Sequence, residues 1–317
     1  MLISFIYKRA LLAFLCFAFI NTTSSFGQDD LMAMLEDNTE EEVEKVTATF
    51  KSLRVINAQT VETIKAKSLM FRVTHRFGNV STGAHSLYGF DEASNIRISF
   101  DYGITDDFLV GFARSKFNEH LDGSLKYKLL AQNSDNSMPL TMTLFASLGC
   151  KPVRWSQIYT GRNDEWIKEN KKFAHRLSYA YQVIIGRKFS PSFSLELLPT
   201  FLHRNYVLYK VNNSNDQVEE NDIISIGIAG RIKLTQRIAL VADYFHNFSK
   251  YRENNVIDPH FGPLGLGIEI ETGGHVFHIN FSNSSGIIEN DFIPDTTDSW
   301  EEGDVKFGFN ISRIFYF

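Results

Sequence analysis

Proline, cysteine and long apolar runs are all scarce in this sequence. Only 7 of the 317 residues are Pro, against 28 Phe and 12 Tyr, and this balance favours strands. The cysteines are Cys16 and Cys150; since Cys16 falls in a predicted leader, one thiol would remain, and one thiol cannot form an internal disulfide. No apolar run of about 18 residues follows the leader, which excludes ordinary transmembrane helices and leaves a transmembrane β-barrel open.

The N-terminus has the pattern of a secretory signal. Lys8 and Arg9 precede an apolar run from Ala10 to Ile20, and small polar residues follow this run. The pattern predicts a signal peptide over residues 1–27, so we expect the protein to leave the cytoplasm.

The C-terminal segment 303–317 is typical of a strand with one apolar face. Its apolar residues alternate with polar or small ones and include Val305, Phe307, Phe309 and Ile311. Phe315 and Phe317 continue the aromatic character to the end of the sequence. Such a face needs a cover, and lipid can supply it.

Eleven further segments upstream show the same division into an apolar and a polar face. They are residues 68–78, 95–103, 107–115, 120–130, 139–149, 173–186, 192–204, 223–234, 237–248, 263–271 and 276–283. Their connections alternate between mostly short and mostly long, as in outer-membrane barrels with periplasmic turns and external loops. The sequence therefore predicts an all-β fold, a transmembrane antiparallel up-and-down β-barrel of about 12 strands over residues 67–317, with both termini periplasmic.

Residues 28–66 differ from the predicted strands. The first part is acidic with a helical pattern, and the second part has short apolar spacing. We interpret this segment as a short N-terminal arm in the periplasm or a plug that enters the lumen; a loosely ordered leader is the alternative.

A resemblance to a known family rests on five stretches: ATFKSLRVINAQTVET, LMFRVTHRFG, NIRISFDYGITDDFLVGFARS, LDGSLKYKLL and ETGGHVFHINFSNSSG. Together they resemble an uncharacterised family of outer-membrane β-barrels, a domain of unknown function, over nearly all of the mature chain. The resemblance implies a barrel in the outer membrane of a Gram-negative-type cell envelope. It implies no activity, because the family has no assigned catalytic or binding residues.

The polar faces of the predicted strands are expected to line the lumen. The candidate lumen residues are Arg72, Arg76, Arg97, Asp101, Asp122, Lys126, Lys128, Arg176, Glu196, Arg204, Arg231, Asp243, Glu269, Glu271 and His278. One interpretation is an ion-paired network that fills a narrow interior. The other is a small-solute pore, in which the mild excess of cations would favour anions.

Two other groups of polar residues suggest a hydrolase site and a calcium site, but their spacing does not fit either one. His278 and Ser282 share a strand face, but four residues of extended strand separate them by about 13 Å, too far for direct proton transfer. The acidic segment 289–304 lacks the spacing of a calcium-binding loop, so we expect a solvated external loop there.

We therefore expect a non-enzymatic, narrow small-solute channel without a cofactor or bound metal. A platform for a periplasmic partner is the alternative, and a barrel-embedded hydrolase of lipase or protease type is a second one. The expected partners are outer-membrane lipids, lipopolysaccharide, the barrel-assembly machinery and, in the platform hypothesis, a periplasmic protein. With a net charge of −5, no nucleic acid is expected among them.

Overall fold

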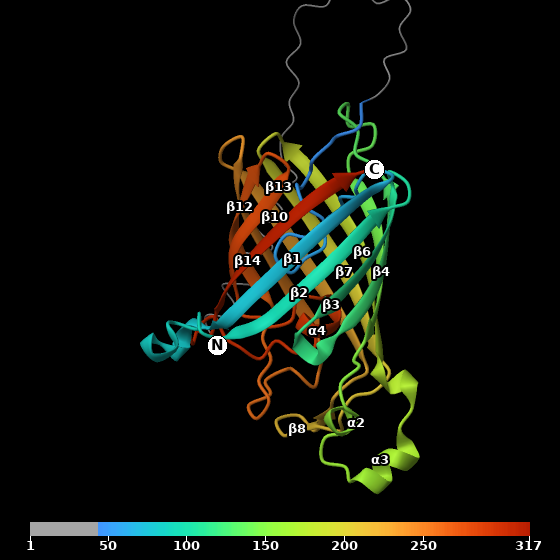
Figure 1. Ribbon diagram of the computed structural model, residues 1–317, viewed down its shortest axis with the longest axis vertical. Coiled ribbons are helices and arrows are strands. Elements are labelled where there is room, and N and C mark those ends of the chain that lie inside the picture. Colours follow the sequence, from blue (N-terminus) through green and yellow to red (C-terminus); the bar gives the residue numbers. More distant parts are fainter. Residues whose placement is uncertain (1–43) are drawn as a thin grey trace, which may run out of the picture. The chain divides into compact units, whose positions relative to one another are not determined.

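The strands of the chain close into a twelve-strand antiparallel barrel (Figure 1). The structure, a computed structural model, describes residues 44–317, so the predicted signal peptide and residues 28–43 lie outside the described part. The barrel strands are β1 (Ser68–Asn79), β2 (Ala93–Gly103), β3 (Phe108–Ser115), β4 (Leu121–Leu130), β5 (Thr141–Cys150), β6 (Leu177–Ser190), β7 (Phe193–Arg204), β10 (Asp222–Lys233), β11 (Ile238–Phe248), β12 (Leu264–Thr272), β13 (His275–Ser282) and β14 (Lys306–Tyr316). The prediction of a closed antiparallel barrel is confirmed.

Closure depends on the pairing of the first strand with the last. β1 and β14 run antiparallel from Ser68↔Tyr316 to Asn79↔Lys306, with one irregularity between Arg76 and Asn79. Every barrel strand therefore has two neighbours, and the ring has no unpaired edge.

The two ends of the barrel differ in their connections. The links β2–β3, β6–β7, β10–β11 and β12–β13 are tight, and we call their side the turn end. The turn end also carries the longer β4–β5 link, residues 131–140. The opposite side, the loop end, carries the other long connections and the short β3–β4 link, residues 116–120, and is seen at the bottom of Figure 1. These contain α2 (Trp155–Ile158), α3 (Asp164–Asn170), the short pair β8 (Val211–Asn212) and β9 (Gln217–Val218), α4 (Glu289–Phe292), and the 3₁₀ turns η1 (Val80–Thr82), η2 (Ala84–Ser86), η3 (Phe117–Glu119) and η4 (Phe173–Arg176). Among residues 44–317, no helix is long and apolar enough to cross a membrane.

The predicted start of the sixth strand is wrong by four residues. Residues 173–176 form η4, and β6 begins only at Leu177. The Arg176 guanidinium donates to the carbonyls of Lys151 and Val153, 2.6 Å each, and lies 3.8 Å from the centre of the Trp155 ring. These contacts hold Arg176 in the loop rather than on the inner face of the strand.

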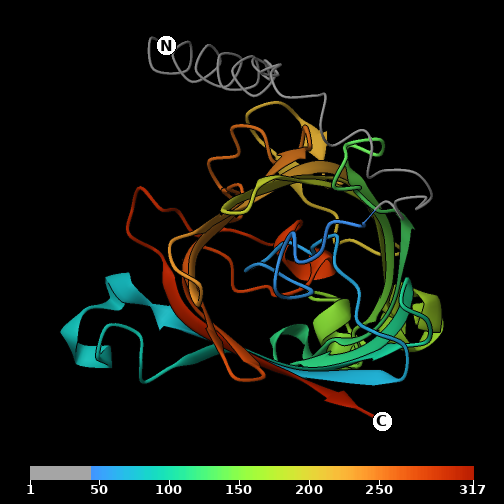
Figure 2. The same ribbon diagram turned by 90° about the horizontal axis from the view of Figure 1, so that it is seen from above.

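Two segments of the chain fold into the barrel and fill it, as seen along the barrel in Figure 2. We call residues 49–64 the inner plug and residues 284–296, which include α4, the outer plug. The inner plug enters from the turn end, and the outer plug is part of the loop between β13 and β14. Most residues of both plugs are buried.

One half of the barrel wall offers the plugs an apolar surface. The cluster combines plug residues Phe50, Val55, Ile56, Ala58, Val61, Phe292 and Ile293 with wall residues Phe145, Ala180, Ile184, Leu198, Leu202, Ile223, Ala229, Val241 and Phe245. These wall residues belong to β5, β6, β7, β10 and β11, which we call the apolar half. Gly186 on β6 permits the close contact, because a Cβ there would lie 2.7 Å from Val61 Cγ1. The remaining strands, β1–β4 and β12–β14, form the polar half, where a smaller apolar cluster joins Leu53 and Ile64 of the inner plug to Met70 and Leu109 of the wall.

The apolar half gives a stability prediction. Leu198 is fully buried against the plugs, whereas its neighbour Leu197 is 41% exposed on the outer face. We expect Leu198→Ala to lower the free energy of unfolding by about 2–5 kcal/mol, because it leaves a cavity in a packed core. The matched Leu197→Ala variant should lose clearly less. Guanidinium unfolding in lipid vesicles measures both, and equal losses would show that the lumen is not packed as described.

Candidate functional site

The inner plug is anchored by one carboxylate of β11. Asp243 Oδ2 accepts hydrogen bonds from the backbone N–H groups of Ile56, Asn57 and Ala58, at 3.0, 2.6 and 3.0 Å. The Asn57 amide also donates to Oδ1 at 2.7 Å. Three successive N–H groups around one buried carboxylate replace its hydration, which allows the charge to stay in the lumen.

Arg54 joins the inner plug to the outer plug. Its guanidinium lies 2.9 Å from the Glu289 carboxylate and donates to the Ile287 carbonyl at 3.0 Å. Both side chains of the ion pair are buried. The two plugs therefore form one bonded unit.

The expectation of a solvated acidic loop over residues 289–304 is wrong at its beginning. Glu289 and Asp291 are completely buried, because α4 folds into the barrel. Asp291 Oδ1 lies 2.9 Å from Nδ1 of the equally buried His120, just before β4. No local pattern in the sequence marks His120 as this partner, since an acid in a loop gives no sign of a distant contact.

Two arginines of β1 hold the plugs from the polar half. Arg76 donates to Asn57 Oδ1 and to the Ser284 carbonyl, both at 2.6 Å, and also to the Gly286 carbonyl. Arg72 donates to Ser52 Oγ at 3.1 Å. Both guanidiniums are buried, so the predicted inward direction of these side chains agrees with their positions.

Other predicted lumen residues pair with each other along the wall. Arg97 and Asp122 form an ion pair of 2.6 Å between β2 and β4. Glu269 on β12 contacts Arg231 at 2.8 Å and the His278 ring at 3.1 Å. All five side chains are buried.

Lys126 and Glu196 contact the inner plug through its backbone. The Lys126 ammonium donates to the Leu53 carbonyl at 3.2 Å, and Glu196 accepts from the Val61 N–H at 3.1 Å. Asp101 is half-buried and lines a residual cavity beside Lys126.

The remaining predicted lumen residues lie at the ends of the barrel. Lys128 and Glu271 are half-buried near the turn end, where Glu271 pairs with Lys51 at 3.2 Å. Arg204, at the end of β7, is buried and contacts Glu219 at 2.9 Å. Arg176 lies in the loop that precedes β6, so its predicted position on the inner face of a strand is wrong.

His278 and Ser282 are not brought together. The His278 ring contacts Glu269 and lies 3.4 Å from the Asn310 amide, while Ser282 Oγ accepts from the Asn57 amide at 3.5 Å. The two side chains therefore do not form a nucleophile and base. Within the described residues, no group of three or more His, Cys, Asp or Glu side chains is arranged to hold a metal ion.

Little free space remains beside the plugs. A cavity of about 20 Å³ lies between the inner plug and the wall, and its charged lining residues are Arg54, Arg72, Arg97, Lys126 and Asp101. A larger cavity of about 460 Å³, which we call the vestibule, lies at the loop end above the outer plug. Its cations are Lys116, Lys151, Arg176, Arg204 and Lys210, and its acids are Glu119, Glu219 and Asp295.

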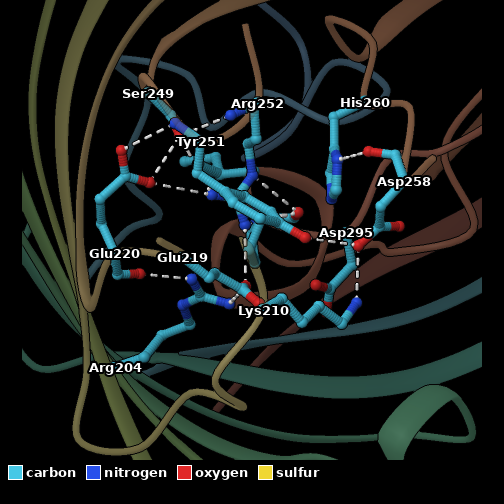
Figure 3. Close-up of polar contacts among 12 residues, drawn as sticks. Arg204, Lys210, Glu219, Glu220, Ser249, Tyr251, Arg252, Asp258, His260 and Asp295 are labelled. Atoms are coloured by element: carbon cyan, nitrogen blue, oxygen red, sulfur yellow. Dashed lines mark hydrogen bonds and ion pairs between the residues drawn. The ribbon is translucent and has the colours of Figure 1, made fainter. Parts of the chain in front are cut away.

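A network of ion pairs ties two loops of the loop end to the outer plug (Figure 3). Arg252 is 7% exposed; it contacts Glu219 at 3.1 Å and donates through Nε to the Pro294 carbonyl at 3.2 Å. Asp258 accepts from the Tyr251 hydroxyl at 2.8 Å. The loops after β7 and β11 therefore support the segment that closes the barrel.

Burial and nearby groups shift the pKa values of three residues in this network. Burial, with the Asp258 carboxylate nearby, raises the pKa of Tyr251 above its ordinary value. Burial opposes the ionisation of Asp258, but hydrogen bonds from Lys210 and Tyr251 hold its pKa below the ordinary value. Burial, followed by the charge of Arg252, lowers the pKa of His260, whose Nδ1 donates to the Asp258 carbonyl at 2.7 Å.

The comparisons with known proteins agree with this geometry. A closed barrel with an apolar outer face and a filled, charged interior defines an integral β-barrel of a membrane. Residues 50–315 match the family described as a membrane bound beta barrel domain (DUF5777), and the chain belongs to this family. The predicted resemblance to an uncharacterised barrel family is confirmed. A search of curated proteins finds no match.

Several solved outer-membrane barrels resemble the chain loosely. The NanC porin is 8% identical, with a TM-score of 0.45 over 78% of this chain and 99% of that one. The KdgM porin is 6% identical, with a TM-score of 0.43 and the same coverage. Omp33 of Acinetobacter baumannii is 10% identical, with a TM-score of 0.39 over 78% of this chain and 98% of that one. Such low scores carry no argument about function, which must come from the lumen itself.

The anchor of the inner plug can be tested by labelling. In a Cys150→Ser background, Ala58→Cys places a thiol at a fully buried position of the plug. We expect Asp243→Ala to speed maleimide labelling of this thiol at least about tenfold, because hydrogen bonds to a charged group contribute roughly 1.5–3 kcal/mol each. Glu271→Ala, which removes only the half-exposed pair with Lys51, should leave the rate near that of the parent. Unchanged labelling after Asp243→Ala would contradict the anchor.

The external network gives a pH prediction through His260. Its folded-state pKa lies below 6.5, so the unfolded loop binds the proton better. The stability of the network is therefore complete above pH 6.5 and falls as the pH drops below that value. Amide hydrogen exchange of residues 249–262, corrected for the intrinsic rate, should increase between about pH 7.5 and about pH 5.5, and His260→Gln should flatten the increase. An identical pH response in the variant would refute this role of His260.

Proposed function

We propose that this chain is a porin-like barrel of the outer membrane of a Gram-negative-type envelope, closed by its own plugs. It passes small solutes, preferentially anions, when the inner plug shifts away from the polar half. The observation that carries the proposal is the residual cavity between the inner plug and the polar half, lined by four cations, Arg54, Arg72, Arg97 and Lys126.

The two halves of the wall oppose plug movement unequally. Separation from the apolar half would expose packed side chains such as Ile184 and Leu198, at roughly 25 cal/mol for each Å² of apolar surface. Separation from the polar half exposes a smaller apolar cluster than separation from the apolar half. It also exchanges hydrogen bonds of Arg72 and Arg76 for hydrogen bonds with water, with a net change of about 0.5–3 kcal/mol each. The polar half is therefore the side where a path can open while the plug stays attached.

The charges along this side favour anions. Asp122 balances Arg97, and Glu289 balances Arg54. Arg72 and Lys126 contact hydroxyl and carbonyl oxygens of the plug rather than carboxylates. Asp101 lines the same space, so Arg72 and Lys126 leave an excess of one positive charge there once the plug moves. A positive excess of this kind is the arrangement that selects anions in a pore.

Contacts at both ends of the described chain support the proposed orientation. The Val46 N–H donates to the Gln132 carbonyl in the β4–β5 link at 2.7 Å, and the Phe317 N–H donates to the Lys67 carbonyl at 3.2 Å. Both contacts lie at the turn end. If short turns face the periplasm, as in outer-membrane barrels, both ends of the described chain face it too. Insertion by the barrel-assembly machinery and contact with lipopolysaccharide at the loop end belong to this proposal.

A second candidate function is a platform for a periplasmic protein. The favouring observation is that Val46, near the start of the described residues, lies at the turn end, the side that would face a periplasmic partner. A barrel-embedded hydrolase has no comparable support, because His278 and Ser282 serve different networks.

Conductance in planar bilayers tests the channel. We expect the parent to be closed most of the time and Arg54→Gln to open at least about tenfold more often, because this change breaks the bonded unit of the two plugs. Lys51→Gln is the control, since it removes a cation of the same segment that lies at the half-exposed rim. A KCl gradient should give a reversal potential of the sign expected for anions.

Two results of the conductance measurement would contradict the proposal. If neither the parent nor a correctly folded Arg54→Gln variant conducts, the channel proposal fails and the platform becomes the better candidate. Folding is checked by the shift in gel mobility of unheated barrels. A reversal potential of the opposite sign would reject the anion preference.

A further inference from the structure

We infer that the vestibule is a binding site for a small hydroxylated solute that carries an anionic group, a carboxylate or a phosphate. This inference rests on the proposed function, because it names the class of solute that would wait above the plugs. The volume of the vestibule, about 460 Å³, lies within the range of pockets that hold small molecules.

Two cations of the vestibule have no acidic partner within residues 44–317. The Lys116 ammonium donates only to the Ala93 carbonyl, at 2.6 Å. Arg176 donates through one terminal nitrogen to the carbonyls of Lys151 and Val153. The other vestibule cations already contact carboxylates. An anionic group on a ligand would supply the missing counter-charge for Lys116 and Arg176.

The position of Arg176 is fixed before a ligand arrives. Its guanidinium stacks on Trp155, which in turn stacks on Tyr159 with ring centres 5.8 Å apart. Tyr159 also makes edge-to-face contacts with the rings of His175 and Tyr206, which stack on each other at 5.2 Å. A guanidinium held in this way loses little freedom on binding, and the donors of its second terminal nitrogen are left for an oxyanion.

Neutral polar groups complete the lining. Asn118, Gln157 and Ser178 border the vestibule with Asn290 of the outer plug. Amide and hydroxyl groups of this kind can exchange hydrogen bonds with the hydroxyls of a solute. Asn290 also contacts Ser147 at 3.0 Å and Ser178 at 2.9 Å, so a ligand in the vestibule would lie directly on the segment that closes the barrel.

Calorimetric titration of the full chain in detergent micelles tests this site. The probes are glucuronate, glucose 6-phosphate and neutral glucose. We expect one or both anions to bind and glucose not to bind, and we expect affinity to fall with added salt. The two anions distinguish a carboxylate from a phosphate preference. Binding of all three sugars alike, or of none, would overturn the inference.

Variants assign the binding to the vestibule. The double variant Lys116→Gln/Arg176→Gln should weaken anion binding at least about tenfold, and Arg176→Lys, which keeps the charge without the planar fork, should retain part of it. The matched control is Arg162→Gln/Lys168→Gln. It removes two exposed cations that lie outside the vestibule lining, in the loop between β5 and β6 that also carries Arg176. An equal loss in the control would mean that general charge, not this site, attracts the anion.

The outcomes separate this inference from the channel proposal. Anion binding without any conductance in the parent or in Arg54→Gln would leave the site standing and reject the channel. Conductance without binding of either anion would leave the channel standing and reject the site.

Discussion

The interior of the barrel is the constraint on which the rest of the structure depends. Twelve strands enclose more space than their own side chains fill, and the inner faces carry charges that cannot be buried without partners. The chain meets both requirements with its own segments. Asp243 accepts hydrogen bonds from backbone N–H groups of the inner plug, and Arg54 forms an ion pair with Glu289 of the outer plug. Filling and charge neutralisation are thus the same set of contacts.

The two halves of the barrel wall hold the plugs by different kinds of contact. On the apolar half, Ile184 and Leu198 pack against the plugs as in the core of a soluble protein. On the polar half, Arg72 and Arg76 hold the plugs through hydrogen bonds that water can replace. In the proposed channel, the plug would loosen on the polar half while its packing against the apolar half is kept.

The sequence predicted the barrel well because the outer face repeats with a period of two residues over every strand. It predicted the positions of Arg72 and Asp243 on inner faces for the same reason. It could not reveal that the segment after β13 turns inward, so Glu289 was expected in solvent. It also misjudged Arg176, because the bonds that hold this residue in a loop come from residues more than twenty positions away. Local pattern defines a strand and its faces, whereas the partner of an inward charge is a property of the closed fold.

The contacts of the inner plug also constrain the order of assembly. The plug lies at the beginning of the described chain, yet Asn57 bonds to Asp243, 186 residues later, and Arg54 bonds to Glu289, 235 residues later. β1 likewise pairs with β14, the last strand of the described chain. The segment synthesised first therefore reaches its final bonds last, and contacts of such long range form slowly. Because both sets of contacts need residues near the C-terminal end of the described chain, completion of the lumen and closure of the ring are expected late in folding.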